Sequence, residues 1–371
     1  MRICFVSFYI YPLLDPKVEV SVGGAEIQIF NLASYMRRIG HEVSIVVADF
    51  GQPDGQVHDG IRLVKAFKPG RNGRLGKIRS KLQLFSALSR SRADLYVASG
   101  ASPDIGLIAL YCRLRGKKFV FRTAHEFDCD GRNEAGGLPG QLYGRGLRCA
   151  DAVVTQHHGH RDLLSRRGIA SEVIRNAFAI TEPGRGARDI DALWVARCEP
   201  WKNPGKFLDL AEAFPGQCFV MICPREPHQA ELFDRIEARA GSLSNLRFVE
   251  KVPFEETTAF FDRARVFVGT SDFEGFPNTY LQACLSGTPI LSYKVDPDGF
   301  IARQGAGLVA GGDDEAMVDG LVRLLDDPEE WRRRAASAWN YVRETHDIET
   351  QGARWASLFD RVAGGRAEPG Q

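Results

Sequence analysis

The sequence predicts an α/β protein made of two doubly wound, Rossmann-like domains with parallel sheets. Short apolar runs alternate with amphipathic stretches along most of the chain, which is the pattern of βαβ units. Two series of such runs occur, separated by a polar segment with Gly and Pro at residues 181–191. The length of 371 residues and the hydrophobic content of 44% allow two ordinary cores. We expect an N-terminal domain at residues 1–180, a linker at 181–191 and a C-terminal domain at 192–348.

The first series consists of apolar runs of strand length separated by helical patterns. The predicted helices include Ala25–Ile39, which stops at Gly40, and Leu75–Ser89. The predicted strands are Ile3–Ser7, Val43–Ala48, Arg62–Ala66, Leu95–Ala98, Phe119–Phe121, Ala152–Thr155 and Glu172–Ile174.

The second series repeats this alternation after the linker. Its predicted strands are Leu193–Ala196, Cys218–Ile222, Leu246–Phe248, Val266–Val268 and Pro289–Ser292. Its predicted helices lie near Pro204–Ala213, Gln229–Ala240, Glu255–Ala264 and Asp314–Leu325. Trp355, Leu358 and Phe359 share one helical face, so a last helix is expected at Glu349–Val362, followed by a frayed tail at Gly364–Gln371.

Composition narrows the classes of protein to consider. The net charge of +1 gives no overall indication of nucleic-acid binding. The eight cysteines lack metal-ligand spacing and lie in or beside apolar runs, so we expect buried free thiols in a reducing cytosol. The apolar N-terminus has a single positive residue and no cleavage site of small residues, which favours a buried strand over a signal peptide. A cytoplasmic protein with no transmembrane helix is expected.

The most informative stretch is VFVGTSDFEGFPNTYLQACLSGTPILSY at Val266–Tyr293. It predicts a strand, a loop, a helix that begins near Pro277, and a second strand. Glu274 therefore lies where the C-terminal end of a strand meets the start of a helix. Open α/β sheets bind ligands at such ends, and the unpaired N–H groups of a helix start favour an anion such as phosphate.

Glu274, seven intervening residues and Gln282 resemble the E-x7-E signature of GT4-type retaining glycosyltransferases, which have the GT-B fold. The wording EGFPNTYLQA is similar to a branch of that family that assembles bacterial polysaccharides and glycolipids. The resemblance implies two Rossmann-like domains that face a central cleft, with a last helix that crosses back to the first domain. The departure is Gln282, because the family has a second Glu there that binds the nucleotide ribose. An amide accepts one hydroxyl and donates to the other, so we expect a modest loss of affinity on the order of 1 kcal/mol.

Arg197 and Lys202 form a second group of candidate residues, in ARCEPWKNP. Two cations at the C-terminal edge of a strand can hold a diphosphate without a metal. The alternative is that Arg197 pairs with Glu199 and Lys202 is solvated. The segment resembles the family pattern G-R-x4-K, with Ala196 in place of Gly, and this implies a role on the leaving group.

Further candidates follow from the resemblance. Gly23 and Gly24 open the first long helix and resemble a GG-x-E loop near the donor diphosphate and the acceptor, although a Gly-rich turn is often only structural. His125 ends a strand and resembles a histidine that faces the donor sugar, while Glu126 and Asp128 are either acceptor contacts or simple loop carboxylates. The other implied donor contacts are Lys251, Val252, Gly275, Phe276, Pro277, Asn278 and Thr279. No metal site is expected, including at the histidine cluster QHHGH, because adjacent histidines point apart in regular structure.

Residues 61–93 contain ten basic residues and no acidic residue. A charge run is usually a solvated face, but this one is long and of one sign in a neutral chain. Anionic lipid attracts such residues, so docking on the cytoplasmic membrane is a hypothesis that suits a lipid-linked acceptor. RNA is the rival partner, disfavoured because stacking aromatics are not interleaved with the basic residues.

The sequence thus predicts a hexosyltransferase that moves a sugar from a UDP- or GDP-sugar to a glycan or glycolipid acceptor, with retention and without a metal or other cofactor. No GxGxxG follows the first strand and no P-loop motif occurs, which counts against a dinucleotide oxidoreductase and a P-loop enzyme. Two other classes stay open: a catalytically silent nucleotide-sugar-binding subunit, which Gln282 raises, and a GT-B-like UDP-sugar epimerase.

Overall fold

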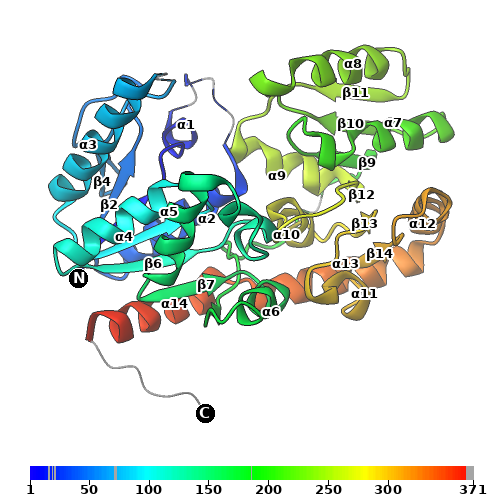
Figure 1. Cartoon of the computed structure of the whole chain (residues 1–371). Helices are drawn as coiled ribbons and strands as arrows, with labels where there is room; N and C mark the ends of the chain where they lie inside the picture. The colour runs from blue at the N-terminus through cyan, green and yellow to red at the C-terminus, as the bar shows by residue number, and fades with distance from the viewer. Residues whose placement is uncertain (16, 19, 21, 71–72, 185, 365–371) are drawn as a thin grey trace. The chain divides into compact units, whose positions relative to one another are not determined.

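The computed structural model describes residues 1–364 except 16, 19, 21, 71–72 and 185, and it divides the chain into two compact units (Figure 1). The first unit is Met1–Ala179 together with Ile348–Gln371, and the second is Ile180–Asp347. Each unit is an α/β body with its own sheet, as the sequence predicts. Of the predicted tail at Gly364–Gln371, Gly364 is the last residue of the final helix, and residues 365–371 lie outside the described residues.

The first sheet has the strand order β3-β4-β2-β1-β5-β6-β7-β8 and is parallel except for the β3–β4 pair. Its strands are β1 (Arg2–Val6), β2 (Glu42–Val47), β3 (Val57–His58), β4 (Ile61–Lys65), β5 (Leu95–Ser99), β6 (Lys118–Arg122), β7 (Ala152–Thr155) and β8 (Glu172–Val173). The helices are α1 (Tyr11–Leu14), α2 (Gly24–Arg38), α3 (Arg74–Ser91), α4 (Asp104–Leu114), α5 (Gly137–Arg148), α6 (His158–Ser165) and α14 (Ile348–Gly364), with short 3-10 turns η1 (Glu126–Asp128) and η2 (Arg132–Glu134).

Alternation along the strands separates two cores on the two faces of this sheet. In β1, Ile3 and Phe5 pack with α2 and α14, whereas Cys4 and Val6 pack with α3, α4 and α5. Successive side chains of a strand point to opposite faces, so each face needs its own layer of helices. The last helix therefore completes the core of the first unit: Trp355, Leu358 and Phe359 on α14 are all buried in the core that contains α2.

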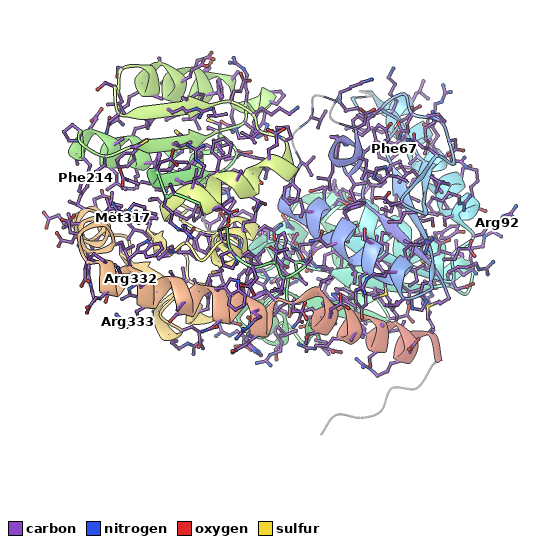
Figure 2. The ribbon with its side chains drawn as sticks, turned by 180° about the vertical axis from the view of Figure 1, so that it is seen from behind. Phe67, Arg92, Phe214, Met317, Arg332 and Arg333 are labelled. Atoms are coloured by element: carbon purple, nitrogen blue, oxygen red, sulfur yellow. The ribbon has the colours of Figure 1, made fainter. Side chains whose placement is uncertain are left out.

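The second sheet is fully parallel and has the order β11-β10-β9-β12-β13-β14. Its strands are β9 (Ile190–Val195), β10 (Phe219–Ile222), β11 (Leu246–Val249), β12 (Ala264–Gly269), β13 (Ile290–Ser292) and β14 (Gly307–Val309). The helices are α7 (Pro204–Ala213), α8 (Ala230–Gly241), α9 (Phe254–Arg263), α10 (Asn278–Leu285), α11 (Phe300–Arg303), α12 (Asp314–Asp326) and α13 (Pro328–Thr345), with turns η3 (Pro200–Lys202), η4 (Pro227–Gln229) and η5 (Pro297–Gly299). One face carries α7, α8 and α12 over a core that includes Met317 and reaches Phe214 (Figure 2).

Most predicted strands and helices coincide with observed ones to within a few residues, and the differences have physical causes. The last two residues of the predicted linker belong to β9, because Ile190 is buried and joins the register with Ala264 of β12. Helices α1, α4, α5, α6, α11 and α13 and strands β3 and β14 were not predicted. α4 is apolar around most of its surface and so lacks a clear amphipathic period. α5 contains four glycines, which lower its intrinsic helix propensity.

Removing the side chain of Phe359 tests the role of α14 in the first core. Phe359 is fully buried, so Phe359→Ala should lower the free energy of unfolding by about 3–5 kcal/mol, through lost burial and the cavity left behind. Leu114→Ala, at a side chain that is 70% exposed, is the control and should cost less than about 0.5 kcal/mol. Chemical denaturation measures both, and equal losses would contradict the role given to α14.

Candidate active site

The candidate donor site lies at the edge of the second sheet where β9 and β12 end. These strands are parallel neighbours, and β10 lies on the other side of β9, so the chain connections diverge between β9 and β12. Ligands of open α/β sheets bind outside the carboxyl ends of the strands at such a switch point. The loop after β9 contains Arg197 and Lys202, and the loop after β12 contains Glu274.

Lys202 and Glu274 form an ion pair across these two loops. Lys202 Nζ donates to Glu274 Oε1, and Ser271 Oγ donates to the same oxygen at 2.7 Å. Only 16% of the Lys202 side chain and 12% of the Glu274 side chain are exposed to solvent. The structure therefore brings together two of the predicted catalytic residues, which are far apart in sequence.

A network of hydrogen bonds holds the two loops in this geometry. Thr270 Oγ1 accepts from Trp194 Nε1 at 2.8 Å and donates to the carbonyl of Lys202 at 2.5 Å. Asn203 takes a left-handed conformation with φ of 48°, and its amide donates to the Thr270 carbonyl at 3.2 Å and to Asp272 Oδ2 at 2.8 Å. Because both loops are anchored to each other, the ion pair has little freedom to open by loop movement alone.

Asp272 and the aromatic residues beside it add to this framework. Lys294 Nζ donates to Asp272 Oδ1 at 2.6 Å, and this hydrogen bond is the main cause that lowers the pKa of Asp272 below its usual range. The rings of Trp201 and Phe273 stack with centroids 6.1 Å apart. The sequence analysis missed these supporting residues. Only Asn203, directly between Lys202 and a helix-starting Pro204, carried a local signal.

Arg197 is half-buried and makes no hydrogen bond or ion pair within the part of the chain that the structure describes. The alternative pairing with Glu199 does not occur. Glu199 is 2% exposed and pairs through Oε1 with Nε2 of His228 at 3.1 Å, while its buried Oε2 has no hydrogen-bond partner among the described residues. The loop after β9 thus presents a cation without a partner next to a buried carboxylate that sequence reasoning treated only as a neighbour of Arg197.

The start of α10 carries the remaining candidates of this loop. Gly275, Phe276 and Pro277 are buried, whereas Asn278 and Thr279 are half-buried in the first turn of the helix. The Phe276 ring stacks on Phe300 with centroids 5.4 Å apart, so this side chain is part of the core. Any ligand contact of this segment is expected from backbone N–H groups at the helix start.

Gln282 points from α10 to α9. It is 9% exposed, and its Nε2 donates to Thr257 Oγ1 at 3.2 Å. The Thr257 hydroxyl in turn donates to the carbonyl of Phe254 at 2.6 Å, so its proton is already used. The Gln282 amide therefore suits this position, because it donates a hydrogen bond to a Thr257 oxygen whose own proton is already engaged. Lys251 and Val252 follow β11 at the same edge of the sheet, where Lys251 is exposed and Val252 is half-buried.

The other candidates belong to the first unit. Gly23 precedes α2 as its N-cap, and a Cβ there would lie 2.7 Å from Glu26 Oε2, so the missing side chain leaves room for that carboxylate at the helix start. Gly24 is the first residue of α2. Glu26, three residues after the N-cap, carries a favourable negative charge at the N-terminus of a helix.

His125 caps the short turn η1 after β6, with Nδ1 accepting from the Phe127 N–H at 3.2 Å. Asp128 fixes this loop, because its carboxylate accepts from the backbone N–H groups of Ala101, Ala124 and His125 at 3.1, 2.6 and 3.0 Å. Burial raises the pKa of Asp128, and only 3% of the residue is exposed. Asp128 thus has a structural role as a carboxylate that holds this loop. Arg132 lies over the Phe127 ring and approaches Glu126 Oε1 at 3.5 Å.

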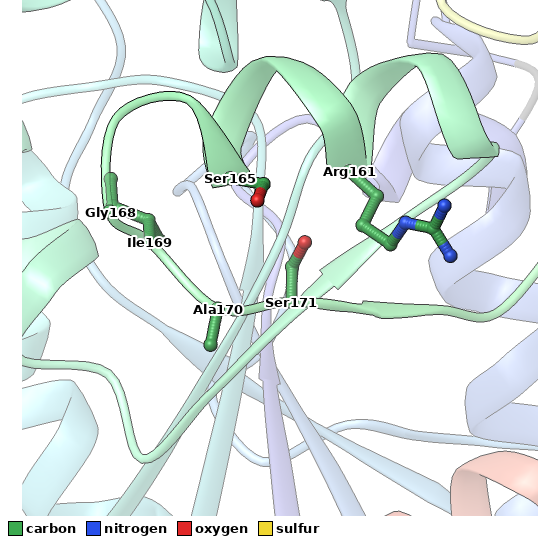
Figure 3. Close-up of a pocket in the computed structure, with 6 residues that line it drawn as sticks. All are labelled: Arg161, Ser165, Gly168, Ile169, Ala170 and Ser171. Carbon is green, nitrogen blue, oxygen red and sulfur yellow. The ribbon is translucent and has the colours of Figure 1, made fainter. Parts of the chain in front are cut away.

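Two other features of the first unit lie apart from the predicted site residues. The rings of His157 and His160, three residues apart in the QHHGH cluster, lie with centroids 3.9 Å apart. No three His, Cys, Asp or Glu side chains among the described residues are grouped to hold a metal ion. A pocket of about 390 Å³ lies between α6 and the loop before β8 (Figure 3). Its lining is Arg161, Ser165, Gly168, Ile169, Ala170 and Ser171, none of which is a predicted site residue.

The comparisons with known proteins agree with this fold. Residues 22–181 match Glycosyltransferase Family 4, and residues 178–339 match Glycosyl transferases group 1. The chain belongs to these glycosyltransferases, of the GT4 type with the GT-B fold.

Two individual relatives share 29% and 25% sequence identity with the chain. The chain is 29% identical to the D-inositol 3-phosphate glycosyltransferase of Corynebacterium efficiens over 160 residues, which cover 40% of this chain and 38% of that protein. It is 25% identical to the glycogen synthase of Mycobacterium tuberculosis over 100% of this chain and 97% of that protein. The chain thus spans about two fifths of the length of the inositol phosphate enzymes that it matches.

A solved structure shows the same fold. Anabaena HepE in complex with UDP and glucose superimposes with a TM-score of 0.76 over 97% of this chain and 99% of that chain, at 14% identity.

Among the described residues, none of the helices has the length and apolar character needed to cross a membrane.

The match between Gln282 and Thr257 predicts the effect of restoring the acid of the family motif. In Gln282→Glu, a carboxylate at neutral pH would replace the amide donor against an oxygen whose proton is already used. We expect the free energy of unfolding to fall by about 1–3 kcal/mol, measured by chemical denaturation. Adding Thr257→Ala to Gln282→Glu should recover part of that loss, because the opposing lone pairs are gone. A Glu variant as stable as the original chain would contradict this account of the contact.

Proposed function

We propose that the protein is a hexosyltransferase that moves a sugar from a UDP- or GDP-sugar to a glycan or glycolipid acceptor, with retention and without a metal ion. The observation that carries this proposal is the Lys202–Glu274 pair at the switch point of the second sheet, in the same loop region as Arg197, which has no partner among the described residues. Membership of the GT4 type supports the class of reaction, and UDP in the HepE structure supports a nucleotide-sugar donor.

The proposed donor would exchange the internal ion pair for contacts with itself. Lys202, Arg197 and Glu274 together carry one net positive charge, which attracts a diphosphate. The diphosphate would take Lys202 from Glu274 and also recruit Arg197 and the N–H groups at the start of α10. Glu274, released from Lys202 but still held by Ser271, would then accept hydrogen bonds from hydroxyls of the donor sugar.

These contacts would act mainly on the leaving group. Cleavage of the bond between the anomeric carbon and the phosphate oxygen leaves negative charge on the nucleoside diphosphate, and groups fixed before the reaction stabilise that charge most effectively. Lys202 and Arg197 supply the charge that a metal ion supplies in other transferases. The resemblance to the family adds His125 at the donor sugar, the acceptor on the first unit, and attack on the face from which the leaving group departs.

The pathway and location belong to the same proposal. We place the reaction in polysaccharide or glycolipid biosynthesis at the cytoplasmic face of the membrane, because the motif EGFPNTYLQA is similar to that branch of the family. The basic residues of 61–93 would hold the enzyme near a lipid-linked acceptor. Of the ten basic residues in this segment, Arg71 and the side chain of Arg74 lie outside the part of the chain that the structure describes.

Removal of Lys202 tests the proposed leaving-group site. Lys202→Ala should reduce transfer at least tenfold, about 1.4 kcal/mol of transition-state stabilisation, because one charge is lost where the diphosphate develops its own. Lys206→Ala is the matched control: this lysine lies four residues further on, pairs with Asp314 at 2.6 Å, and should keep transfer near normal. An unchanged transfer rate in Lys202→Ala would contradict the assignment of Lys202 to the leaving-group site.

Donor identity is measured first by thermal shift with UDP, GDP, ADP and CMP, each in the presence of EDTA or of magnesium. A shift with one nucleoside diphosphate that does not need magnesium, followed by transfer of label from the matching nucleotide-sugar to a bacterial lipid extract, is the expected result. A shift without transfer to any acceptor would favour a nucleotide-sugar-binding subunit, and sugar conversion without an acceptor would favour an epimerase.

A further inference from the structure

Three helices form one continuous outer layer on the first unit. α3, α4 and α5 cover the same face of the sheet, and all three contribute to one core. Lys81 pairs with Asp104, and the rings of Phe85 and Tyr111 meet edge to face at 5.8 Å, which holds α3 beside α4. A Cβ at Gly106 would lie 2.3 Å from the carbonyl oxygen of Leu142, so α4 and α5 are in backbone contact. Figure 1 shows the three helices together.

This layer collects the exposed large hydrophobic side chains of the molecule. Eleven such side chains occur among the described residues, and six of them lie on these helices of 18, 11 and 12 residues. Their spacings of three and four residues place them on one stripe of α3 and one stripe of α4. The six are Leu75 (84% exposed), Ile78 (58%), Leu82 (67%), Leu110 (47%), Leu114 (70%) and Leu138 (66%).

The charge of the same layer is almost entirely positive. The three helices contain eight basic residues and one acidic residue, Asp104, which is buried and already paired with Lys81. Four exposed cations form no ion pair with any other described residue: Lys77, Arg79, Arg113 and Arg145. Arg92 follows α3 and lies at the outer edge of the first unit in Figure 2.

Apolar stripes bordered by unpaired cations match the interface of an anionic bilayer better than other partners. Lipid acyl chains take up leucine side chains while anionic headgroups pair with the surrounding cations. A second copy of the same face would bring like charges together, which opposes self-association. The aromatic residues of these helices, Phe85, Tyr111 and Tyr143, face inward, so they offer no platform for stacking nucleic-acid bases.

We propose that the α3–α4–α5 layer is a membrane-docking face whose exposed leucine and isoleucine side chains enter an anionic lipid surface. The proposal deepens the proposed function, on which it rests for the reason to meet a lipid-linked acceptor. Insertion of apolar side chains is also a different mode of binding from electrostatic adsorption through the basic residues of 61–93. At least four of those charges are used inside the unit: Arg62 donates to the carbonyls of Arg90 and Ser91, and Lys65, Lys81 and Arg90 pair with Asp49, Asp104 and Asp54. The docking face instead continues onto α4 and α5.

The test is co-sedimentation of the full chain with vesicles of phosphatidylcholine, alone or mixed with phosphatidylglycerol. The apolar variant carries Leu75→Gln, Ile78→Gln and Leu82→Gln. Its matched control carries Ile39→Gln, Val57→Gln and Val322→Gln, three exposed hydrophobic side chains outside the layer. We expect the original chain and the control to bind mixed vesicles and the apolar variant to bind about tenfold less.

A charge variant with Lys77→Gln, Arg79→Gln and Arg113→Gln separates insertion from adsorption. We expect it to lose the preference for phosphatidylglycerol, whereas the original chain should keep part of its binding when salt rises from about 0.1 M to about 0.5 M. Equal binding by the apolar variant and its control would overturn insertion. Failure of the original chain to bind any vesicle would overturn docking, as would dimerisation in solution that the apolar variant abolishes.

The outcomes are separable from those of the proposed function. Thermal shifts with UDP and GDP report on the second unit and should be the same in the apolar variant and the original chain. Loss of vesicle binding with an intact nucleotide shift concerns docking alone. Vesicle binding by a protein that shows no nucleotide shift would overturn the transferase and leave the docking face supported.

Discussion

The parallel pairing of β9 with β12 is the constraint on which the candidate site depends. Both strands end at the same edge of the sheet, so the loops that follow them are neighbours even though Lys202 and Glu274 are 72 residues apart in sequence. With β10 on the other side of β9, the chain connections diverge between β9 and β12, which is the position where open α/β sheets bind ligands. The hydrogen bonds that join these two loops, from Asn203 to the Thr270 carbonyl and from Thr270 to the Lys202 carbonyl, depend on that adjacency.

The internal ion pair has two consequences that work against each other. It compensates two charges that are mostly withdrawn from water, and leaving either charge alone there would be costly. It also has to be exchanged when the proposed diphosphate binds, which reduces the net gain from Lys202. Arg197 makes no such exchange, because it has no partner among the described residues. The two cations are thus expected to differ: Lys202 couples donor binding to Glu274, whereas Arg197 adds attraction directly.

The sequence predicts the strands of both sheets well, because buried parallel strands are short apolar runs. It also places Lys202 and Glu274 at strand ends, where motif and fold agree. The contact between them is not readable from local pattern, since strand order is a long-range property. The sequence motif suggests only a ligand contact for Gln282, because its hydrogen bond to Thr257 depends on where α9 packs. α5 was not predicted because its glycines lower helix propensity, whereas in the folded protein the helix is stabilised by packing against its neighbours.

Those glycines explain how the outer layer of the first unit packs. A helix-interior glycine costs about 1 kcal/mol relative to alanine, so α5 is weak as an isolated segment. Added Cβ atoms at Gly140 and Gly146 would lie 2.6 Å from the Glu134 carbonyl oxygen and from the Gly106 nitrogen, so close packing needs those glycines. The packing fixes α5 on α4, and the Lys81–Asp104 pair helps to hold α3 on α4. The exposed leucines are thus carried by helices that already pack on the sheet, and a surface formed in advance loses less conformational entropy on binding than a segment that folds there.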